Sequence, residues 1–498
     1  MEKTKNNESH VIIGHVLGQG EKEHVMKRLE TVLNCLKHNG IPCNVDEMPN
    51  IAVLGSGGGL RAMVALLGSL GALDEVQLLD SVMYLSGVSG STWCMSSLYK
   101  KQDWSTNLKD LTDDIVKRLV DGKVPFIKKR VELMKYFGES ENFSLTHAWA
   151  AMIISGVVKE IDEEGVTWQE GYSTKDPYPI YTVIDQKCKH EKQYKDVWFE
   201  ITPHLSGYSH TGAFVDTKHL GSKFKNGSST EPQPEMDMLY LQGLCGSALA
   251  DRTAIFKWIS EHVKGILPTV SFSHPNLLSG DCLVQKQNPP KFQDGGMIMA
   301  TQSWRPFTTL KRLLSLIKKI MELLLNWTWG TTNNFLYSMT DPCCSNLQTE
   351  TRRYEDTALL VNSPYFSMLR EERKVDLIIS LDFSDGDPFE TLTTTADKCK
   401  ELNIPFPEVK SGDKENPLDF YVFKGEGPTV IHIPLFNSVN CPGQVQEYRD
   451  KYSTIKLNYS DNKIKDLMKK AALNIHNNKE KLLKEIKEIV QQNKKNKA

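Results

Sequence analysis

The chain has 498 residues, and its 60 lysines and arginines nearly balance 62 aspartates and glutamates, which leaves a formal net charge of −2. The length suits one large catalytic domain with an insertion, or about two to three domains, while the near-zero charge gives no argument for nucleic-acid binding. The 10 cysteines are scattered without Cys-x-x-Cys spacing, which indicates reduced thiols and argues against a disulfide framework or a zinc site.

The first predicted element is a helix over residues 21–38. Its apolar residues recur at helical spacing, and Gly40 follows where a C-terminal stop is expected. Residues 1–7 carry no apolar signal region, and no run along the chain approaches the roughly 18 apolar residues that a membrane span requires. We therefore expect a cytoplasmic protein whose contact with intracellular membranes is peripheral.

A glycine-rich loop follows the first predicted strand, which begins at Ile51. The loop runs from Gly55 to Gly59 and leads into a helix that extends to about Leu73. Leu60 stands where a Rossmann fingerprint needs glycine or alanine, and the Gly-Lys-Ser/Thr of a Walker loop is missing, so phosphate binding is poorly supported. Bare N–H groups at a helix start suit an oxyanion hole, where each donor is worth about 3 to 4 kcal/mol in acyl transfer.

A second loop carries a candidate nucleophile. An apolar strand over residues 80–85 precedes this loop, and a helix begins near Trp93. A serine between glycines at a sharp strand-to-helix turn has an exposed hydroxyl backed by a helix N-terminus, and Ser89 fits this description. The motif departs from Gly-x-Ser-x-Gly at Ser91, and a Gly/Ser-rich tract is as often a plain turn. Together the two loops and their strands form one right-handed βαβ unit, which places both loops at the carboxyl edge of a parallel sheet.

The predicted domain organisation follows from the remaining patterns. Residues 1–45 form an N-terminal helical segment, 46–460 a main domain with a lid or cap at about 226–344, and 461–498 a basic amphipathic helix. Within the cap, residues 307–329 form an amphipathic helix with a basic polar face, which suits either a membrane interface or burial against the core. The C-terminal helix suits an anionic membrane or plain solvation. The chain ends without a Cys-a-a-X prenylation signal, so lipid anchoring of that kind is not expected.

The two loops resemble those of the cytosolic (group IV) phospholipase A2 catalytic domain, which is related to patatins. Segments that match in the same order are 55–63, 85–93, 177–180, 198–203, 221–225, 243–248, 329–337 and 375–384. Within this family, the chain resembles the form without a calcium-binding C2 domain. The resemblance implies an α/β fold with a central, largely parallel sheet, helices on both faces and a lid or cap insertion.

The resemblance also implies an activity and a set of site residues. The expected enzyme is a calcium-independent phospholipase A2 or lysophospholipase that works at a phospholipid membrane surface, with no cofactor and no metal. It hydrolyses acyl esters of glycerophospholipids through an acyl-serine intermediate, releasing fatty acid and lysophospholipid. The resemblance assigns Ser89 and Asp356 to a catalytic Ser-Asp dyad. It assigns the oxyanion hole and the substrate phosphate site to Gly57, Gly58, Gly59, Arg61 and Arg370.

Two aspartates are candidates for the base that accepts the Ser89 proton. Asp294 has the better local motif, because two glycines follow it, whereas Asp356 is followed by Asn-Ser-Pro at 362–364, as the resemblance requires. We choose Asp356, although Thr357 carries a Cβ atom where a tight turn favours glycine. For either aspartate, the alternative role is to cap a turn.

Two other interpretations of the chain remain open. In the first, the protein keeps the phospholipase fold as a catalytically weak membrane-binding or structural protein, because the altered turn after Asp356 misplaces the base. In the second, it is an α/β-hydrolase with a histidine base that acts on a soluble ester or thioester. The chain has 13 histidines, His204, His210 and His219 among them, but no pattern singles one out. Ser91 and the upstream position of the glycine loop count against this second interpretation.

Overall fold

The computed structural model describes residues 10–171, 175–250 and 305–496. The chain divides into two compact units, one made of Met1–Leu249 with Thr328–Ala498 and the other of Ala250–Trp327. The second unit is shorter than the predicted cap region at 226–344. No helix in the described ranges is both long enough and apolar enough to cross a lipid bilayer.

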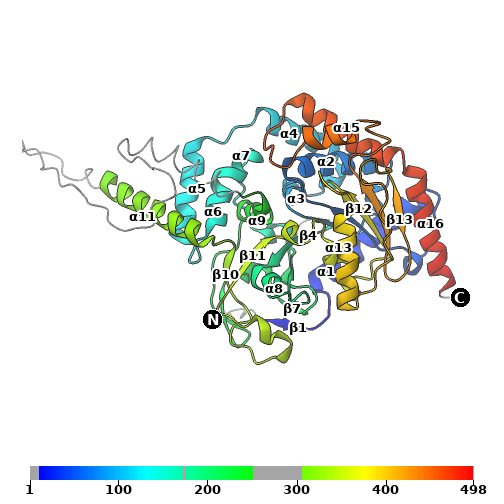
Figure 1. Ribbon diagram of the computed structural model, residues 1–498. Coiled ribbons are helices and arrows are strands. Elements are labelled where there is room, and N and C mark those ends of the chain that lie inside the picture. Colours follow the sequence, from blue (N-terminus) through cyan, green and yellow to red (C-terminus); the bar gives the residue numbers. More distant parts are fainter. Residues whose placement is uncertain (1–9, 172–174, 251–304, 497–498) are drawn as a thin grey trace, which may run out of the picture. The chain divides into compact units, whose positions relative to one another are not determined.

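A 12-stranded sheet forms the centre of the first unit (Figure 1). Its main path is β1-β7-β6-β5-β4-β3-β2-β12-β14-β13, and β11 joins it by pairing with β4 and β10. The central strands pair in parallel and read as continuous apolar runs, because both faces of a parallel sheet are covered. They are β2 (Ile51–Gly55), β3 (Tyr84–Gly87), β4 (Tyr178–Asp185), β12 (Leu377–Asp382) and β14 (Thr429–Pro434).

Antiparallel strands extend this parallel centre on both sides. They are β1 (Ile12–Ile13), β5 (Trp198–Ile201), β6 (Leu205–Tyr208), β7 (Ala213–Asp216), β10 (Thr331–Asn333), β11 (Thr351–Asp356) and β13 (Tyr421–Phe423). A separate hairpin joins β8 (Lys223–Lys225) and β9 (Ser228–Glu231). The predicted α/β class with a largely parallel central sheet is therefore confirmed, and the antiparallel extensions are an addition to it.

The helices of the first unit lie between and around these strands. They are α1 (Gln19–His38), α2 (Gly59–Glu75), α3 (Gly90–Tyr99), α4 (Leu108–Asp121), α5 (Phe126–Glu139), α6 (Leu145–Trp149), α7 (Ser155–Val157), α8 (Gln186–His190), α9 (Met238–Cys245), α12 (Tyr365–Met368), α13 (Glu390–Leu402), α14 (Val445–Lys451), α15 (Asp461–His476) and α16 (Lys479–Lys495). The helix predicted over residues 21–38 corresponds to α1. Residues 80–85 are strand only from Tyr84, because Leu79–Ser81 form a 3-10 turn instead.

The C-terminal segment folds against the body of the first unit as two helices. α15 packs on α2, and the two helices lie side by side in Figure 1. The approach is close, since a Cβ atom on Gly68 of α2 would lie 2.7 Å from the Met468 carbonyl oxygen. The apolar residues Leu467 of α15 and Ile486 of α16 are buried. The apolar sides of these helices therefore face protein, and their lysines supply the outer surface.

In the second unit, the described part is mainly α11 (Arg305–Asn326), which overlaps the amphipathic helix predicted over residues 307–329. Leu316, Ile320 and Leu324 of this helix are buried. Leu314 and Leu325 are 44% and 72% exposed. The helix thus has one buried apolar row and isolated exposed leucines.

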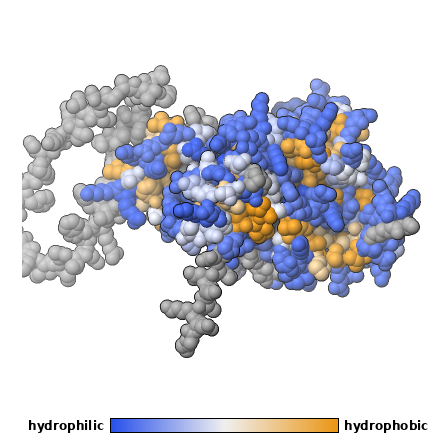
Figure 2. Space-filling model, turned by 90° about the horizontal axis from the view of Figure 1, so that it is seen from below, coloured by the Kyte–Doolittle hydropathy of each residue, from blue (hydrophilic) through white to orange (hydrophobic). Residues whose placement is uncertain are grey.

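Hydrophobic residues also reach the surface of the first unit. The face drawn in Figure 2 is mostly hydrophilic, with hydrophobic residues gathered in patches. On α5, Ile127 and Val131 are 63% and 61% exposed, and the basic residue Lys128 is exposed between them in sequence. The exposed side of α5 therefore combines aliphatic and cationic side chains.

Candidate active site

Ser89 lies on a sharp turn between β3 and α3, as its sequence motif predicts. Its backbone has φ +52° and ψ −118°, and its side chain is 3% exposed. A non-glycine residue with positive φ is strained, and such strain is typical of the nucleophile elbow, where a serine hydroxyl projects from a strand-to-helix turn.

The serine turn and the glycine loop are in direct contact. A Cβ atom on Gly90 would overlap the carbonyl oxygen of Gly59, so the approach of the two loops requires glycine at position 90. Ser91 Oγ donates a hydrogen bond of 2.7 Å to the carbonyl oxygen of Ser56. Ser91, which departs from the Gly-x-Ser-x-Gly motif, therefore links the serine turn to the glycine loop through a hydrogen bond.

Asp356 lies at the end of β11 and contacts Ser89. The Ser89 side chain lies close enough to the fully buried Asp356 carboxylate to lower its pKa as a hydrogen-bond donor. Two main-chain groups hold the carboxylate, since Ala248 N donates to Oδ2 over 3.2 Å and Ala358 N donates to Oδ1 over 2.9 Å. Burial raises the pKa of Asp356 to about 7, although these hydrogen bonds oppose the rise. The carboxylate can therefore take up a proton near neutral pH.

The residues after Asp356 do not strain the turn. Thr357 begins a short 3-10 helix, Thr357–Leu359, which Asp356 caps through Ala358 N. Neither Thr357 nor Ala358 has positive φ, so their Cβ atoms are accommodated and glycine is not needed there. The other aspartate considered from the sequence, Asp294, lies outside the described residues.

Only some of the N–H groups of the glycine loop lack an acceptor among the described residues. Gly57 N donates to the Asn362 carbonyl oxygen over 3.0 Å, so the expected oxyanion donor at Gly57 is already used. Gly58 and Gly59, with φ +152° and +58°, donate to no acceptor among the described residues. Both stand at the N-terminus of α2, where the helix dipole favours an anion. The two donors left for an oxyanion are Gly58 and Gly59.

Arg61 is buried below this loop with 1% exposure and lines the same cavity as Ser89. Its Nη1 contacts Asp385 Oδ2 at 3.0 Å. Nε donates to the carbonyl of Phe383, Nη1 also donates to that of Tyr452, and Nη2 donates to Thr454 Oγ1. An arginine has five N–H donors, so one N–H on Nη2 remains. A Cβ atom on Gly58 would lie 2.7 Å from this nitrogen.

Arg370 lies in a buried ion network and is not among the residues that line the cavity. Its Nη1 contacts Glu200 Oε1 at 2.6 Å, and Arg373 bridges Glu200 and Glu21. Burial alone raises the pKa of Glu200, but the charges of Arg373 and Arg370 outweigh it and lower the pKa to about 2. The contacts of Arg370 are those of a structural residue.

Arg370→Met is accordingly expected to lower the free energy of unfolding by about 3 kcal/mol, because it leaves part of a buried charge unpaired. Chemical denaturation measures this. Arg353→Met is the matched control, since Arg353 is exposed, and a change within about 0.5 kcal/mol is expected there. Equal unfolding midpoints for the Arg370 variant and the wild-type protein would contradict the structural role.

A cavity of about 340 Å3 opens beside Ser89, and its lining includes Gly58, Arg61, Ser89, Asn362, Ser384 and Asp385. No histidine lines it within the described part of the chain. His210 Nε2 is hydrogen-bonded to the Phe366 carbonyl and His204 Nδ1 to the Tyr178 hydroxyl. These contacts give no support to a histidine base for Ser89.

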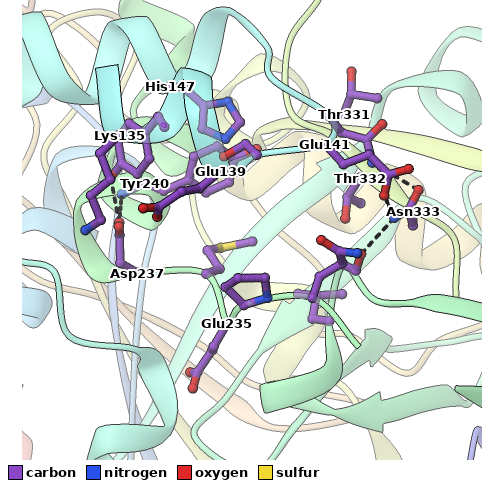
Figure 3. A pocket seen from close by; sticks show the side chains of 18 of the residues that line it. Lys135, Glu139, Glu141, His147, Glu235, Asp237, Tyr240, Thr331, Thr332 and Asn333 are labelled. Atoms are coloured by element: carbon purple, nitrogen blue, oxygen red, sulfur yellow. Dashed lines mark hydrogen bonds between the residues drawn. The ribbon is translucent and has the colours of Figure 1, made fainter. Parts of the chain in front are cut away.

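A second cavity, of about 310 Å3, lies at the N-terminal end of α9 (Figure 3). Asp237 caps this helix by accepting from Tyr240 N over 2.8 Å, and it also accepts from the Tyr136 hydroxyl. Burial raises the pKa of Asp237 to about 6. Beyond its other end, α9 leads to Ser247, whose Oγ accepts from the main-chain N of Asp356. This cavity thus borders the start of a helix whose far end supports Asp356.

The chain is similar to known proteins over most of its length. Residues 51–264 match the family described as a lysophospholipase catalytic domain. The chain is 35% identical to cytosolic phospholipase A2 gamma from Homo sapiens, over 95% of each chain. It is 34% identical to the Mus musculus protein of the same name, over 95% of this chain and 91% of that one. The structure of human GIVD cytosolic phospholipase A2 is 22% identical and covers 98% of this chain and 69% of that one, with a TM-score of 0.74.

Proposed function

Since this chain belongs to the cytosolic phospholipase A2 family and is a phospholipase A2, we propose a mechanism for its activity. In this proposal, the enzyme cleaves glycerophospholipid acyl esters without calcium, through a Ser89–Asp356 dyad. Fatty acid and a lysophospholipid are the products. Lysophospholipids carry the same ester type, so lysophospholipase activity at the same serine is part of the proposal.

The proposed reaction begins with proton transfer within the dyad. Asp356 accepts the Ser89 hydroxyl proton while the serine oxygen attacks the ester carbonyl carbon. The carbonyl oxygen becomes negative and accepts hydrogen bonds from the N–H groups of Gly58 and Gly59. When the ester bond breaks, the departing lysophospholipid oxygen takes the proton from Asp356. Water repeats the sequence on the acyl-serine, which releases the fatty acid and restores the serine hydroxyl.

One observation carries the proposal, namely that Ser89 lies beside a buried carboxylate whose pKa is about 7 and interacts with it as a hydrogen-bond donor. An ordinary aspartate is too weak a base to accept a hydroxyl proton readily, and a pKa near the working pH improves this transfer. The base and the two N–H donors supply the proton acceptor and the oxyanion site, so the proposed steps contain no role for calcium. For Arg61, the remaining N–H on Nη2 supports a contact to the substrate phosphate.

We also propose that the enzyme is cytoplasmic and meets its lipid substrate peripherally. The exposed side of α5 supports this, because Ile127 and Val131 are mainly exposed and Lys128 lies between them. Aliphatic side chains beside cationic ones suit the interface of an anionic membrane. The paired and buried apolar sides of α15 and α16 leave those helices less suited to insertion.

The activity is tested by fatty-acid release from phosphatidylcholine vesicles in the presence of excess calcium chelator. We expect release by the wild-type enzyme to survive chelation and Ser89→Ala to abolish it, with both proteins equally folded. Release that stops on chelation and returns with added calcium would refute calcium independence. Release by Ser89→Ala at the wild-type rate would refute the dyad.

The pH dependence follows from the environment of Asp356. Burial raises its pKa to about 7 against the hydrogen bonds from Ala358 N, Ala248 N and Ser89, and the neighbouring Glu355 adds to the rise. Only the ionised carboxylate accepts the serine proton, so we expect kcat/KM to be constant above pH 7 and to fall about tenfold per unit below it. Initial rates between pH 5 and 9, with vesicle binding followed in parallel, measure this. A profile that is flat down to pH 5 would contradict the assignment.

A further inference from the structure

A hydrogen-bonded chain beside the Ser89 cavity ends on Gly57, the residue before the two available N–H donors. Asn362 Nδ2 donates to Gly57 O over 3.3 Å and to Ser384 Oγ over 3.1 Å. Ser384 Oγ in turn donates to Asp382 Oδ1 over 2.8 Å. The Asn362 main-chain oxygen also accepts from Gly57 N over 3.0 Å. Asn362 therefore contacts both polar main-chain groups of Gly57, and Ser56 Oγ also donates to Gly57 O, over 3.4 Å.

The direction of the hydrogen bonds in this chain is fixed at its buried end. Asp382 ends β12 and is 1% exposed, and an ionised carboxylate can only accept hydrogen bonds. Ser384 must then donate to Asp382 and accept from Asn362, which turns the amide nitrogen of Asn362, not its oxygen, toward Gly57 O. Burial raises the pKa of Asp382 to about 7, against the Ser384 hydrogen bonds and the charges of Arg61 and Arg449, so the carboxylate is ionised at pH 8.

One carboxylate oxygen of Asp382 has no hydrogen-bond partner among the described residues. This oxygen, Oδ2, is buried. Leaving a buried polar atom unpaired destabilises a fold, and buried polar atoms are seldom left so. A hydrophobic residue would fill this site without that loss, so the carboxylate points to a requirement other than stability.

The peptide bond between Gly57 and Gly58 links the anchored oxygen to an oxyanion donor. The Gly57 carbonyl and the Gly58 N–H belong to one planar unit, and in a trans peptide they point in opposite directions. None of the described peptide bonds is cis. A hydrogen bond that anchors Gly57 O therefore also sets the direction of Gly58 N–H. Glycine has no Cβ atom to restrict the rotation of this unit, so the anchor has to come from another residue.

We propose that Asn362, held by Ser384 and Asp382, is a positioning residue that aims the Gly58 N–H at the oxyanion. The inference rests on the proposed function, because it takes the Gly58 donor to stabilise the tetrahedral intermediate. Asn362 Oδ1 would lie 2.5 Å from a Cβ atom on Gly57, so the same amide also restricts position 57 to glycine. The three residues act on the reaction through the main chain of Gly57.

The first test compares serine variants on phosphatidylcholine vesicles at pH 8. Ser384→Ala breaks the link between Asp382 and Asn362, and we expect kcat to fall about tenfold with KM unchanged, a partial loss of one oxyanion donor. Ser384→Thr keeps the hydroxyl and should recover most of this loss. Ser363→Ala is the matched control, because Ser363 is buried next to Asn362 and its hydroxyl has no partner among the described residues.

The second test is a double-mutant cycle with Gly58→Ala. In the Gly58→Ala background the Gly58 N–H is already displaced from the oxyanion, so the hydrogen bonds that position it no longer affect the rate. Ser384→Ala should therefore change kcat by less than about twofold in that background. Equal losses in both backgrounds, or wild-type kcat for Ser384→Ala, would overturn the positioning role. Failure of the proposed function is recognised separately, because wild-type enzyme would then release no fatty acid or Ser89→Ala would still release it.

Discussion

Asp356→Asn is expected to lower kcat by about four orders of magnitude, the size of effect seen when an aspartate that supports a serine nucleophile is neutralised. The asparagine has nearly the same shape as the buried carboxylate, so the fold should persist. Its amide cannot accept and hold the Ser89 proton, which leaves the serine hydroxyl unactivated. Single-turnover and steady-state release of fatty acid, with circular dichroism as a check on folding, measure the effect.

Asp294→Asn is the matched control for this substitution. It makes the same chemical change at the other aspartate that the sequence offered, and it should leave kcat within about twofold. The opposite pattern, with turnover lost at position 294 and kept at position 356, would show that the base had been assigned to the wrong residue.

Gly58→Ala is expected to lower kcat by about 100-fold to 1000-fold, the loss associated with one oxyanion donor. The added Cβ atom would lie 2.7 Å from Arg61 Nη2 and 3.0 Å from the Phe383 carbonyl oxygen. In addition, the backbone at φ +152° is a conformation that alanine rarely adopts. Relief of these contacts moves the peptide that carries the donor, so kcat should fall more than KM rises.

Gly71→Ala provides a control on the same helix. A Cβ atom on Gly71 meets no atom within 4 Å, and this position lies in the interior of α2. Alanine there should leave kcat unchanged and raise stability by about 0.5 to 1 kcal/mol. If both glycine variants had wild-type kcat, the Gly58 N–H could not be an oxyanion donor.

The centre of the fold was predictable because its signals are local. The apolar runs before the two loops correspond to β2 and β3, and glycines marked the turns that follow. The antiparallel strands β1, β6 and β7 were not predicted from the sequence, since each has only two to four residues. The C-terminal segment showed an amphipathic pattern, but periodicity alone does not say whether an apolar side meets lipid or protein. Here α15 meets α2.

The site was predictable where a residue stood in a distinctive local motif. Ser89 and the glycine loop had such motifs, and Asp356 was chosen from the sequence that follows it. Arg370 had no local pattern of its own, and the structure places it with Glu200, 170 residues away in sequence. Asn362 could be noted only as part of the Asn-Ser-Pro motif, because its contact with Gly57 joins residues 305 positions apart. Such pairings are properties of the fold and have no sequence signature.

The packing of α15 on α2 has a consequence for shortened forms of the protein. A shortened form of the protein that ended near residue 460 would still contain every residue with a proposed role in catalysis. It would nevertheless uncover the helix that begins at Gly59, including the side where Gly68 meets the Met468 main chain. Residues 461–476 therefore support the helix that follows the glycine loop, and a shortened form that retains all of the motifs would lose this support.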